Sequence, residues 1–200
     1  MPWSTFGWLE PRRSLGHWRT FGWLEPRQSL GQEVLLIAAV YPGSFDPVHF
    51  GHIDIAERAH AIFGRLVVAV YEHPQKAVLF PVEERVAMMR EALAHLPNVE
   101  VAAYCGLTVD FVRRQGARVI VRGLRVITDF EIEYQMALMT SRLAPEVEMV
   151  CLMTSLEHAF ISSSIVKDVA MAGGSVAQLV PAHVEEALRR RLLAPASAKE

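Results

Sequence analysis

The sequence lacks several features that mark whole classes of proteins. Its two cysteines, Cys105 and Cys151, are too few for a disulfide framework and too far apart for a metal-binding pair. No apolar run approaches the ~18 residues that a membrane span requires, and the N-terminus lacks the apolar segment of a secretory signal. The formal net charge is −2, whereas a general nucleic-acid-binding protein is usually clearly basic. We therefore predict a cytoplasmic protein with neither a membrane nor a nucleic acid as its partner.

The common nucleotide-binding motifs are also absent. The 200 residues contain no GxxxxGK[ST] phosphate-binding loop and no GxGxxG dinucleotide-binding turn. Any nucleotide site in this chain must therefore be built from other residues.

Tryptophan is absent after residue 23, because all four tryptophans lie near the N-terminus. There the segment 5–12, TFGWLEPR, recurs at 20–27 as part of a 15-residue tandem duplication. Two copies are too few for a repeat protein, and their proline and glycine residues oppose a long helix. We interpret residues 1–32 as a disordered appendage and residues 33–200 as the folded domain. A tryptophan-bearing docking peptide is the alternative for the appendage.

In the remainder of the chain, apolar runs alternate with segments of helical periodicity. The first apolar run, residues 34–41, is typical of a strand covered on both faces, and Pro42 and Gly43 are predicted to end it. This alternation predicts an α/β fold with a doubly wound, five-stranded parallel sheet, which is Rossmann-like. Ligands of such sheets bind beyond the carboxyl ends of the strands. The predicted strands are residues 34–41, 66–70, 99–103, 118–122 and 148–153, and the predicted helices are residues 51–63, 82–96, 107–114, 128–141, 163–172 and 184–193.

The loop after the first strand, residues 41–52, carries two histidines to the start of a helix. Free backbone N–H groups and the positive end of the helix dipole make this position suitable for an anion, and Gly51 allows a phosphate to approach the backbone. A lone histidine there is more often a helix cap than a catalytic group. A metal site made by His49, His52 and Asp46 is a further alternative.

Phosphate-binding residues also follow other predicted strands. Arg122 and Arg125 flank a glycine at the end of the fourth strand, where two guanidinium groups suit a phosphate, although a solvated surface pair is the simpler interpretation. Lys76, one of three lysines against seventeen arginines, follows the second strand. The segment 161–164, ISSS, opens a helix after the fifth strand, either as a cap or as a second phosphate position. The coincidence of these features at four strand ends favours a phosphate-binding site.

With these residues assembled, residues 34–193 resemble the phosphopantetheine adenylyltransferase family of the nucleotidyltransferase superfamily, which is marked by a (T/H)xGH motif. The resemblance rests on four motifs that occur in the family's order: YPGSFDPxxxGHxD at 41–54, VRGLR at 121–125, DFExE at 129–133 and FISSSxVK at 160–167. It implies transfer of AMP from ATP to 4′-phosphopantetheine, giving dephospho-coenzyme A and pyrophosphate in coenzyme A biosynthesis. It also implies Mg²⁺ as cofactor, a homohexamer, feedback binding of coenzyme A and no covalent enzyme intermediate.

The resemblance also implies roles for individual residues. His52 would stabilise the pentacovalent transition state at the α-phosphate. Two positions depart from the family's pattern: Thr108 stands where relatives often have Leu or Met, and Ile132 stands where relatives often have Tyr. The implied catalytic residues are His52, Lys76 and Arg125. The implied acceptor-binding residues are Ser44, Lys76, Thr108 and Arg122. The implied ATP-binding residues are Ser44, Phe45, His52, Gly123, Leu124, Arg125, Glu133, His158, Ala159, Phe160, Ile161, Ser162, Ser163 and Ser164.

Two other functions remain open at this point. One is another (T/H)xGH nucleotidyltransferase, such as nicotinamide mononucleotide adenylyltransferase or an enzyme that makes CDP-alcohols. The other is a non-catalytic module that binds a nucleotide or coenzyme A. Lys76 and the VRGLR segment favour the pantetheine enzyme over the first, and the intact set of His52, Lys76, Arg122 and Arg125 argues against the second. The ligands of a metal ion are not predicted.

Overall fold

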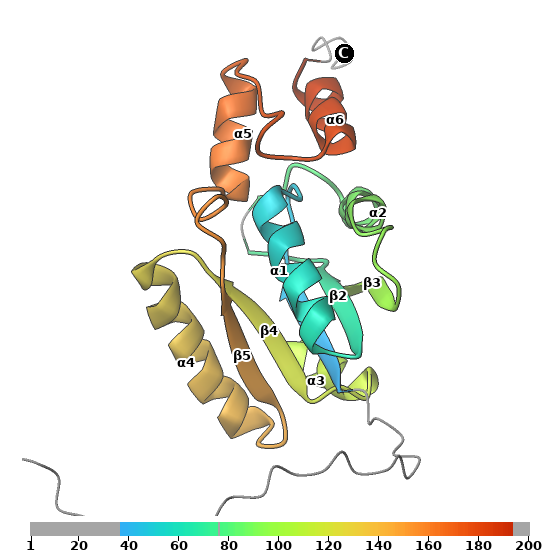
Figure 1. Cartoon of the computed structure of the whole chain (residues 1–200), viewed down its shortest axis with the longest axis vertical. Coiled ribbons are helices and arrows are strands. Elements are labelled where there is room, and N and C mark those ends of the chain that lie inside the picture. Colours follow the sequence, from blue (N-terminus) through green and yellow to red (C-terminus); the bar gives the residue numbers. More distant parts are fainter. Residues whose placement is uncertain (1–36, 76, 194–200) are drawn as a thin grey trace, which may run out of the picture. The chain divides into compact units, whose positions relative to one another are not determined.

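The computed structural model describes residues 37–75 and 77–193, which form one five-stranded sheet and six helices (Figure 1). The predicted appendage, residues 1–32, lies outside the described residues, and its disorder stays a prediction. None of the helices in the described part is long and apolar enough to cross a membrane. The strands are β1 (Ala38–Gly43), β2 (Arg65–Tyr71), β3 (Val99–Tyr104), β4 (Val119–Leu124) and β5 (Glu148–Met153). The helices are α1 (Phe50–Ile62), α2 (Val82–Ala92), α3 (Thr108–Arg114), α4 (Ile127–Leu143), α5 (Ser163–Met171) and α6 (Ala182–Leu193).

The sheet is parallel throughout, with the strand order β3-β2-β1-β4-β5. The chain builds outwards from β1 through β2 to β3 and then crosses to the other side of β1 for β4 and β5. The direction of winding therefore reverses between β1 and β4. At such a switch point the connections leave the two strand ends in opposite directions and open a crevice between them. The predicted doubly wound fold is confirmed, and this crevice is the expected place for a ligand.

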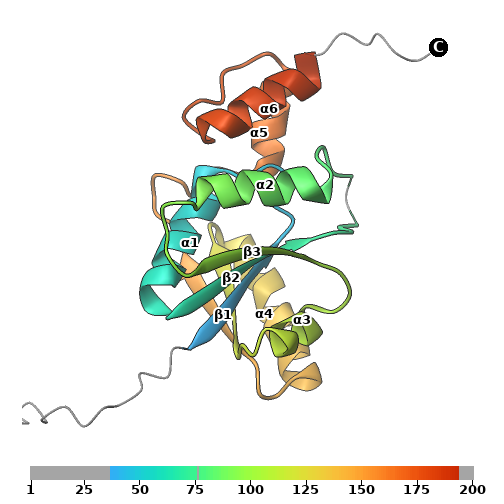
Figure 2. The ribbon, with the colours of Figure 1, turned by 90° about the vertical axis from the view of Figure 1, so that its right-hand side faces the viewer.

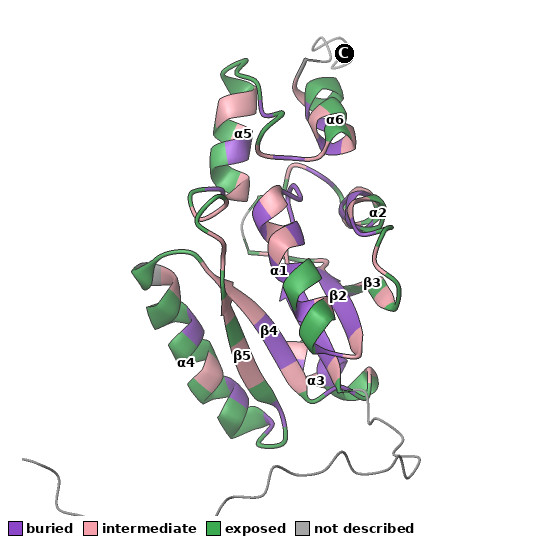
Figure 3. Cartoon of the chain, viewed as in Figure 1, coloured by how far each residue is buried: buried purple, intermediate pink, exposed green. Residues whose placement is uncertain are grey.

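Both faces of the central strands are covered, because their alternate residues point into two separate hydrophobic clusters. Tyr41 and Val68 belong to the cluster that includes residues of α1 and α2, whereas Val40 and Val67 belong to the cluster that includes residues of α3. Figure 2 shows α2 and α3 on opposite sides of the strands. Burial is concentrated on β1, β2 and the inner side of α1, while much of α4 is exposed (Figure 3).

The predicted end of the first strand is wrong, because β1 continues through Pro42 and Gly43. β1 pairs with β2 along its whole length but with β4 only at Ala39 and Val40. The Pro42 carbonyl accepts a hydrogen bond from Arg122 Nη1 at 2.8 Å on the β4 side. The backbone N and O atoms of one strand residue point to the same side of the strand. The nitrogen of Pro42 therefore also faces β4, and at this position β1 has no backbone pairing with β4. The proline at position 42 therefore removes no backbone hydrogen bond from the sheet.

The other elements lie where the sequence predicts them, with ends that differ by up to four residues. The largest difference at a helix end concerns α2, which ends at Ala92 rather than at Leu96. A turn follows, in which the Leu96 N–H donates to the Leu93 carbonyl at 2.9 Å. Pro97 comes next in the chain and disfavours helical backbone at the residue before it, so the helix does not extend to Leu96 as predicted.

Candidate functional site

Two cavities lie beside the switch between β1 and β4. Cavity 1 lies at the carboxyl ends of these strands, and cavity 2 also reaches Ile120 and Met149, near the start of β4 and β5. Cavity 1 has a volume of about 290 Å³, and cavity 2 has a volume of about 410 Å³. Cavity 1 is lined by residues 41–45, 49, 51–52, 55, 122–123, 125, 129, 133, 154 and 162–164. Cavity 2 is lined by residues 42–44, 71, 104, 106–109, 120, 122, 133, 136, 139–140, 143 and 149. They share a wall made by Pro42, Gly43, Ser44, Arg122 and Glu133.

The sequence places phosphate-binding residues at separate strand ends, and three of them, His52, Arg122 and Arg125, do meet in the structure, because all three line cavity 1. They come from the first turn of α1 and from the end of β4 with the residue that follows it. Strands β1 and β4 pair only near their start, so their carboxyl ends are free to hold a ligand between them. The site is therefore a product of the sheet topology.

The start of α1 holds its two histidine rings in a fixed stack. The His49 and His52 rings have centroids 3.5 Å apart with an interplanar angle of 22°. His52 Nδ1 accepts a hydrogen bond from the His49 backbone N–H at 3.3 Å, which fixes the orientation of the His52 ring. The Phe45 ring packs against His52 at 4.9 Å with its plane at 87°. The His52 imidazole is thus held by neighbours on both sides before any ligand binds.

Gly43 is required for this packing. A Cβ atom at Gly43 would lie 2.6 Å from the Phe45 ring, which is closer than real Cβ atoms approach other atoms. Phe45 itself has a φ of 48°, in the left-handed region that non-glycine residues seldom adopt. It is nevertheless buried, with 2% of its surface exposed. Strained backbone of this kind is concentrated at functional sites.

His49 is a buried, neutral imidazole. Its pKa is lowered from 6.5 to about 3, mainly by burial, with a smaller contribution in the same direction from its electrostatic interactions with Arg125 and His158. Its side chain is 3% exposed, and Nδ1 has no hydrogen-bond partner among the described residues. At neutral pH this ring therefore adds no positive charge to cavity 1 and serves as a flat surface beside His52.

Each of the two arginines of the site is held by a carboxylate. Arg122 donates from Nε and Nη2 to Glu133 at 2.8 and 2.6 Å. Arg125 donates from its backbone N and from Nε to Asp129 Oδ2, both at 3.1 Å, and from Nη2 to Oδ1 at 3.3 Å. Arg125 Nη1 also donates to the Ile161 carbonyl at 3.1 Å, so Arg125 links the residues that follow β4 to the segment before α5. The guanidinium groups are therefore oriented in advance.

Asp129 is a residue of this site that the sequence prediction omitted from its site residues. The signal was present, because Asp129 opens the DFExE segment and follows Arg125 by only four residues. The first turn of α4 favours an acidic residue for its own dipole, which gave Asp129 an ordinary explanation. Its contact with Arg125 shows that it also shapes cavity 1.

Two helices begin at cavity 1 without an acidic residue in their first turn. These are α1 and α5, whereas α2, α3, α4 and α6 each have an acidic residue there. The positive ends of α1 and α5 are thus not neutralised by their own side chains, which suits a bound phosphate. Ser162 is the N-cap of α5 and accepts from the Ile165 N–H at 3.2 Å, so the cap interpretation is right for it. Ser162 also lines cavity 1, together with Ser163 and Ser164.

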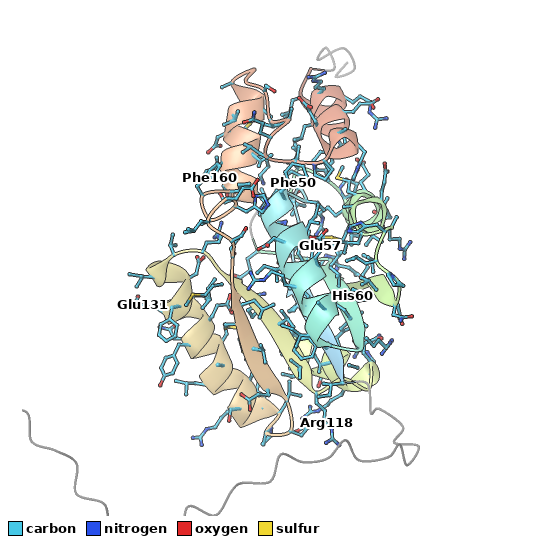
Figure 4. The ribbon with its side chains drawn as sticks, viewed as in Figure 1. Phe50, Glu57, His60, Arg118, Glu131 and Phe160 are labelled. Carbon is cyan, nitrogen blue, oxygen red and sulfur yellow. The ribbon has the colours of Figure 1, made fainter. Side chains whose placement is uncertain are left out.

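Some predicted ATP-binding residues lie outside cavity 1. Leu124, Ala159 and Phe160 do not line it, and Figure 4 labels Phe160 on the segment that joins β5 to α5. The His158 ring stacks on Phe50, with centroids 6.1 Å apart, in a separate groove between α1 and α2. Ile161 contributes only its carbonyl, to Arg125. Lys76 lies outside the described residues, and its role stays a prediction.

Cavity 2 has an apolar character. Its lining includes Met136 and Met139 from α4 and the ring of Tyr71. Thr108, the predicted residue of the pantetheine side, lines this cavity, and its Oγ1 lies 3.0 Å from the Tyr104 hydroxyl. Burial raises the pKa of Tyr104, so its hydroxyl stays protonated and available for hydrogen bonding. The two tyrosines were not predicted, because aromatic residues at the ends of strands resemble ordinary core residues.

The alternative metal site is wrong. The Asp46 carboxylate is fully buried and points away from the histidines, accepting from the Leu79 and Phe80 N–H groups at 2.9 Å each and from Lys167 Nζ at 2.9 Å. Within residues 37–75 and 77–193, no group of three or more His, Cys, Asp or Glu side chains could hold a metal ion. Asp46 instead joins the loop after β1 to the segment before α2 and to α5.

Comparison with known proteins adds three findings. The cytidylyltransferase-like family matches residues 40–169. The phosphopantetheine adenylyltransferase of Gloeobacter violaceus is 55% identical over 153 residues, covering 76% of this chain and 95% of that protein, and that of Heliobacterium modesticaldum is 56% identical over 146 residues, covering 73% and 87%. A solved structure of a putative nicotinate-nucleotide adenylyltransferase from Vibrio parahaemolyticus matches with a TM-score of 0.58 at 14% identity, over 77% of this chain and 99% of that one. At that identity the structural likeness supports the fold alone.

Proposed function

The chain belongs to the phosphopantetheine adenylyltransferase family of the cytidylyltransferase-like proteins, and from this premise we propose that it transfers AMP from ATP to 4′-phosphopantetheine. The products are dephospho-coenzyme A and pyrophosphate. The observation that carries the proposal is the pair of cavities with one common wall, since one is lined by charged and hydroxyl groups and the other by apolar side chains. A triphosphate suits the first, and the pantetheine arm suits the second.

The reaction joins two phosphates where the cavities meet. An oxygen of the acceptor phosphate forms a bond to the α-phosphorus of ATP, and the bond between that phosphorus and the oxygen bridging to the β-phosphate breaks. Because a phosphate monoester has its second pKa at about 6, the attacking oxygen is already deprotonated at neutral pH and needs no general base. The lowered pKa of His49 agrees with this, since an imidazole with a pKa of about 3 is too weak a base to take up a proton at neutral pH.

The residues of cavity 1 would act by stabilising charge. Negative charge grows on the oxygens of the α-phosphate in the transition state, and preorganised donors aimed at that charge are worth most in a partly buried site. The His52 ring, fixed by Phe45 and His49, would supply one donor. Arg125, Ser162 and the other lining serines would hold the rest of ATP. Arg122 and Ser44 lie on the common wall, where both phosphates would meet.

The residues of cavity 1 fit a magnesium ion that is held mainly by the nucleotide. Mg²⁺ takes oxygen ligands and is usually bound through substrate phosphates with one or two carboxylates. The carboxylates that line cavity 1 belong to Asp129 and Glu133, and each is already engaged by an arginine. Serine hydroxyls and the phosphates of ATP would then provide most of the remaining oxygens. When bound, the ion would neutralise charge on the phosphates.

A homo-oligomer is part of the proposal, with six copies expected from the resemblance. Helix α4 leaves many large apolar side chains exposed, including Ile127 at 85% and Phe130 at 55% (Figure 3). Phe130 and Tyr134 stack on the surface of this helix with ring centroids 6.0 Å apart. Apolar surface of this extent is usually covered by a partner, and a second copy would cover it.

Feedback binding of coenzyme A is also proposed, since coenzyme A carries both a pantetheine arm and an adenine nucleotide and so resembles both substrates. The cytoplasmic location stays a prediction.

The proposal is tested by measuring pyrophosphate release in the presence of Mg²⁺ from three donor and acceptor pairs: ATP with 4′-phosphopantetheine, ATP with nicotinamide mononucleotide, and CTP with glycerol phosphate. We expect turnover with 4′-phosphopantetheine and formation of dephospho-coenzyme A, identified by its mass. Turnover only with nicotinamide mononucleotide or glycerol phosphate would assign the chain to another transferase reaction. Binding of ATP or coenzyme A without pyrophosphate release from any acceptor would identify a non-catalytic module.

A further inference from the structure

Arg85 is a buried positive charge that the reaction does not use directly. It lies on α2, its surface is 0% exposed, and it is among the largest fully buried side chains of the described residues. Its partners in the described part of the chain are all backbone carbonyls. Nε donates to Phe80 at 3.0 Å, Nη1 donates to Ser44 at 2.7 Å and to Tyr71 at 2.8 Å, and Nη2 donates to Glu72 at 3.2 Å.

A charged side chain in such a place needs an explanation. Burying a charge is costly unless every donor is satisfied, and an apolar residue of similar size would fill the same space at lower cost. The planar guanidinium group offers five N–H donors in a rigid fork, so it can bind carbonyls that converge from different segments. Arg85 does so at the carboxyl ends of two neighbouring strands, because Ser44 follows β1 and Tyr71 ends β2.

The segments that Arg85 joins form one side of the site. Ser44 lines both cavities, and Tyr71 lines cavity 2 but not cavity 1. A single atom of Arg85, Nη1, donates to both carbonyls. The position of the Arg85 guanidinium group therefore sets the distance between Ser44 and Tyr71 in the wall of cavity 2. Asp46 holds the neighbouring segment from the other side, through the N–H groups of Leu79 and Phe80. Arg85 thus reaches cavity 1 through the carbonyl of Ser44.

We propose that Arg85 is a positioning residue for the acceptor: it holds Ser44 and Tyr71 at the spacing that lets cavity 2 bind 4′-phosphopantetheine. It acts through the two carbonyls and does not touch the substrate. The inference rests on the proposed function, because it assigns cavity 2 to the acceptor. It goes beyond that function by separating a residue that shapes acceptor binding from those that bind ATP.

The test compares Arg85→Lys with Arg90→Lys, a matched change on the same helix. Lysine keeps the charge but cannot reach four carbonyls, whereas Arg90 is exposed and makes one bond, from Nη2 to the Val101 carbonyl at 3.0 Å. Acceptor KM is measured from turnover, acceptor Kd by calorimetry without turnover, and ATP Kd without acceptor. For Arg85→Lys we expect acceptor KM and Kd to rise about tenfold or more, as misplacement by ~1 Å can cause, while ATP Kd changes by less than about threefold. For Arg90→Lys all three should stay within about twofold of the wild type, as for most exposed side chains.

All assays are run below the melting transition of each variant, which is followed by circular dichroism. A lower melting temperature with unchanged acceptor KM and Kd would reduce Arg85 to a structural role and overturn the inference. An equal loss of ATP and acceptor binding would overturn it too. If Arg85→Lys does not fold, Arg85→Gln removes the buried charge, keeps an amide donor and is expected to show the same split. If the wild type binds phosphopantetheine but does not transfer AMP to it, the proposed function fails, and the acceptor Kd values of the variants still test the role of Arg85. If the wild type does not bind phosphopantetheine at all, both the proposed function and the inference fail.

Discussion

Cavities 1 and 2 share a wall of five residues and yet offer opposite chemistry. Cavity 1 contains imidazole, guanidinium, carboxylate and serine groups, and the starts of α1 and α5 face it. Cavity 2 contains tyrosine, methionine and leucine side chains, with one hydroxyl pair between Tyr104 and Thr108. The difference indicates a division of tasks: one region orients charge toward phosphates, and the other binds a less polar arm. The common wall is the place where the two substrates would meet.

The charge in cavity 1 is balanced rather than in excess. Arg122 pairs with Glu133, and Arg125 pairs with Asp129, so the two arginines bring their own neutralising carboxylates. A site of this kind stabilises a transition state through fixed directions of its donors, with little reorganisation when the reaction occurs. If that is how cavity 1 works, changes there should lower turnover, whereas changes in cavity 2 should weaken binding of the acceptor.

The largest effect is expected for His52→Ala. Removal of one preorganised donor to a developing oxyanion commonly lowers kcat by ~10²–10³-fold, and we expect a loss in this range with acceptor KM little changed. Pyrophosphate release measures kcat, and circular dichroism checks that the variant is folded. His95→Ala is the control, because His95 is an exposed histidine paired with Glu57 at 2.9 Å outside both cavities. A His52→Ala variant that kept most of its turnover would reject the proposed role.

A smaller effect is expected for Arg122→Lys on the common wall. Lysine retains the charge but loses the fork that binds Glu133 with two bonds, so acceptor KM should rise by about tenfold and kcat should fall less. Steady-state kinetics with varied phosphopantetheine measures both. Arg118→Lys is the control, because Arg118 is exposed just before β4, at the opposite end of that strand from Arg122 (Figure 4). Equal kinetics for Arg122→Lys and the wild type would place the acceptor phosphate elsewhere.

The buried imidazole of cavity 1 should make stability depend on pH. In the unfolded chain His49 takes up a proton as the pH falls through 6.5, whereas in the folded protein it does so only near 3. The unfolded state therefore binds more protons in this window, and the free energy of unfolding should fall by up to about 1.4 kcal/mol for each pH unit below 6.5. Urea unfolding at pH 7 and pH 5 measures this. His49→Gln should show a weaker dependence of the unfolding free energy on pH than the wild type. His73→Gln, at an exposed histidine, is the control and should keep the wild-type dependence. The same dependence in all three proteins would contradict the buried neutral state of His49.

The smallest effect is expected for Thr108→Val in cavity 2. Valine keeps the shape and removes the partner of the Tyr104 hydroxyl, a change worth about 1 kcal/mol for a neutral hydrogen bond. We expect acceptor KM to rise a few-fold, with kcat and ATP Kd unchanged. Tyr104→Phe and the double variant complete a cycle in which the two effects should not add, because both remove the same bond. Additive effects, or a loss of kcat, would show that the two hydroxyls act separately or that cavity 2 takes part in the chemistry.

Much of the fold could be predicted because its signals are local. Apolar runs and helical periodicity placed all the strands and helices, and the alternation of the two predicted a parallel sheet. Phosphate-binding residues at strand ends then predicted that His52, Arg122 and Arg125 meet, since such ends gather on one edge of the sheet. The end of β1 was missed because Pro42 disrupts a strand only where its N–H would be paired, and that depends on how far β4 extends alongside it.

The rest of the site could not be predicted because it depends on contacts between distant segments. Arg85 and Ser44 are 41 positions apart, and Lys167 and Asp46 are 121 positions apart. Nothing in the sequence near Arg85 distinguishes it from an exposed arginine of an amphipathic helix. Its burial and its carbonyl partners exist only because α2 packs beside the ends of β1 and β2.

The amino-acid sequence by itself determined the order of strands and helices, the placing of histidine, arginine and serine at strand ends, and through its motifs the family. These properties follow from local backbone preferences and from the polarity of neighbouring residues. The tertiary structure alone decided which arginine pairs with which carboxylate, that His49 is buried and neutral, and that a polar and an apolar cavity share one wall. Those outcomes depend on how the helices pack across the two faces of the sheet, because a side chain's burial and partners are set by every segment around it.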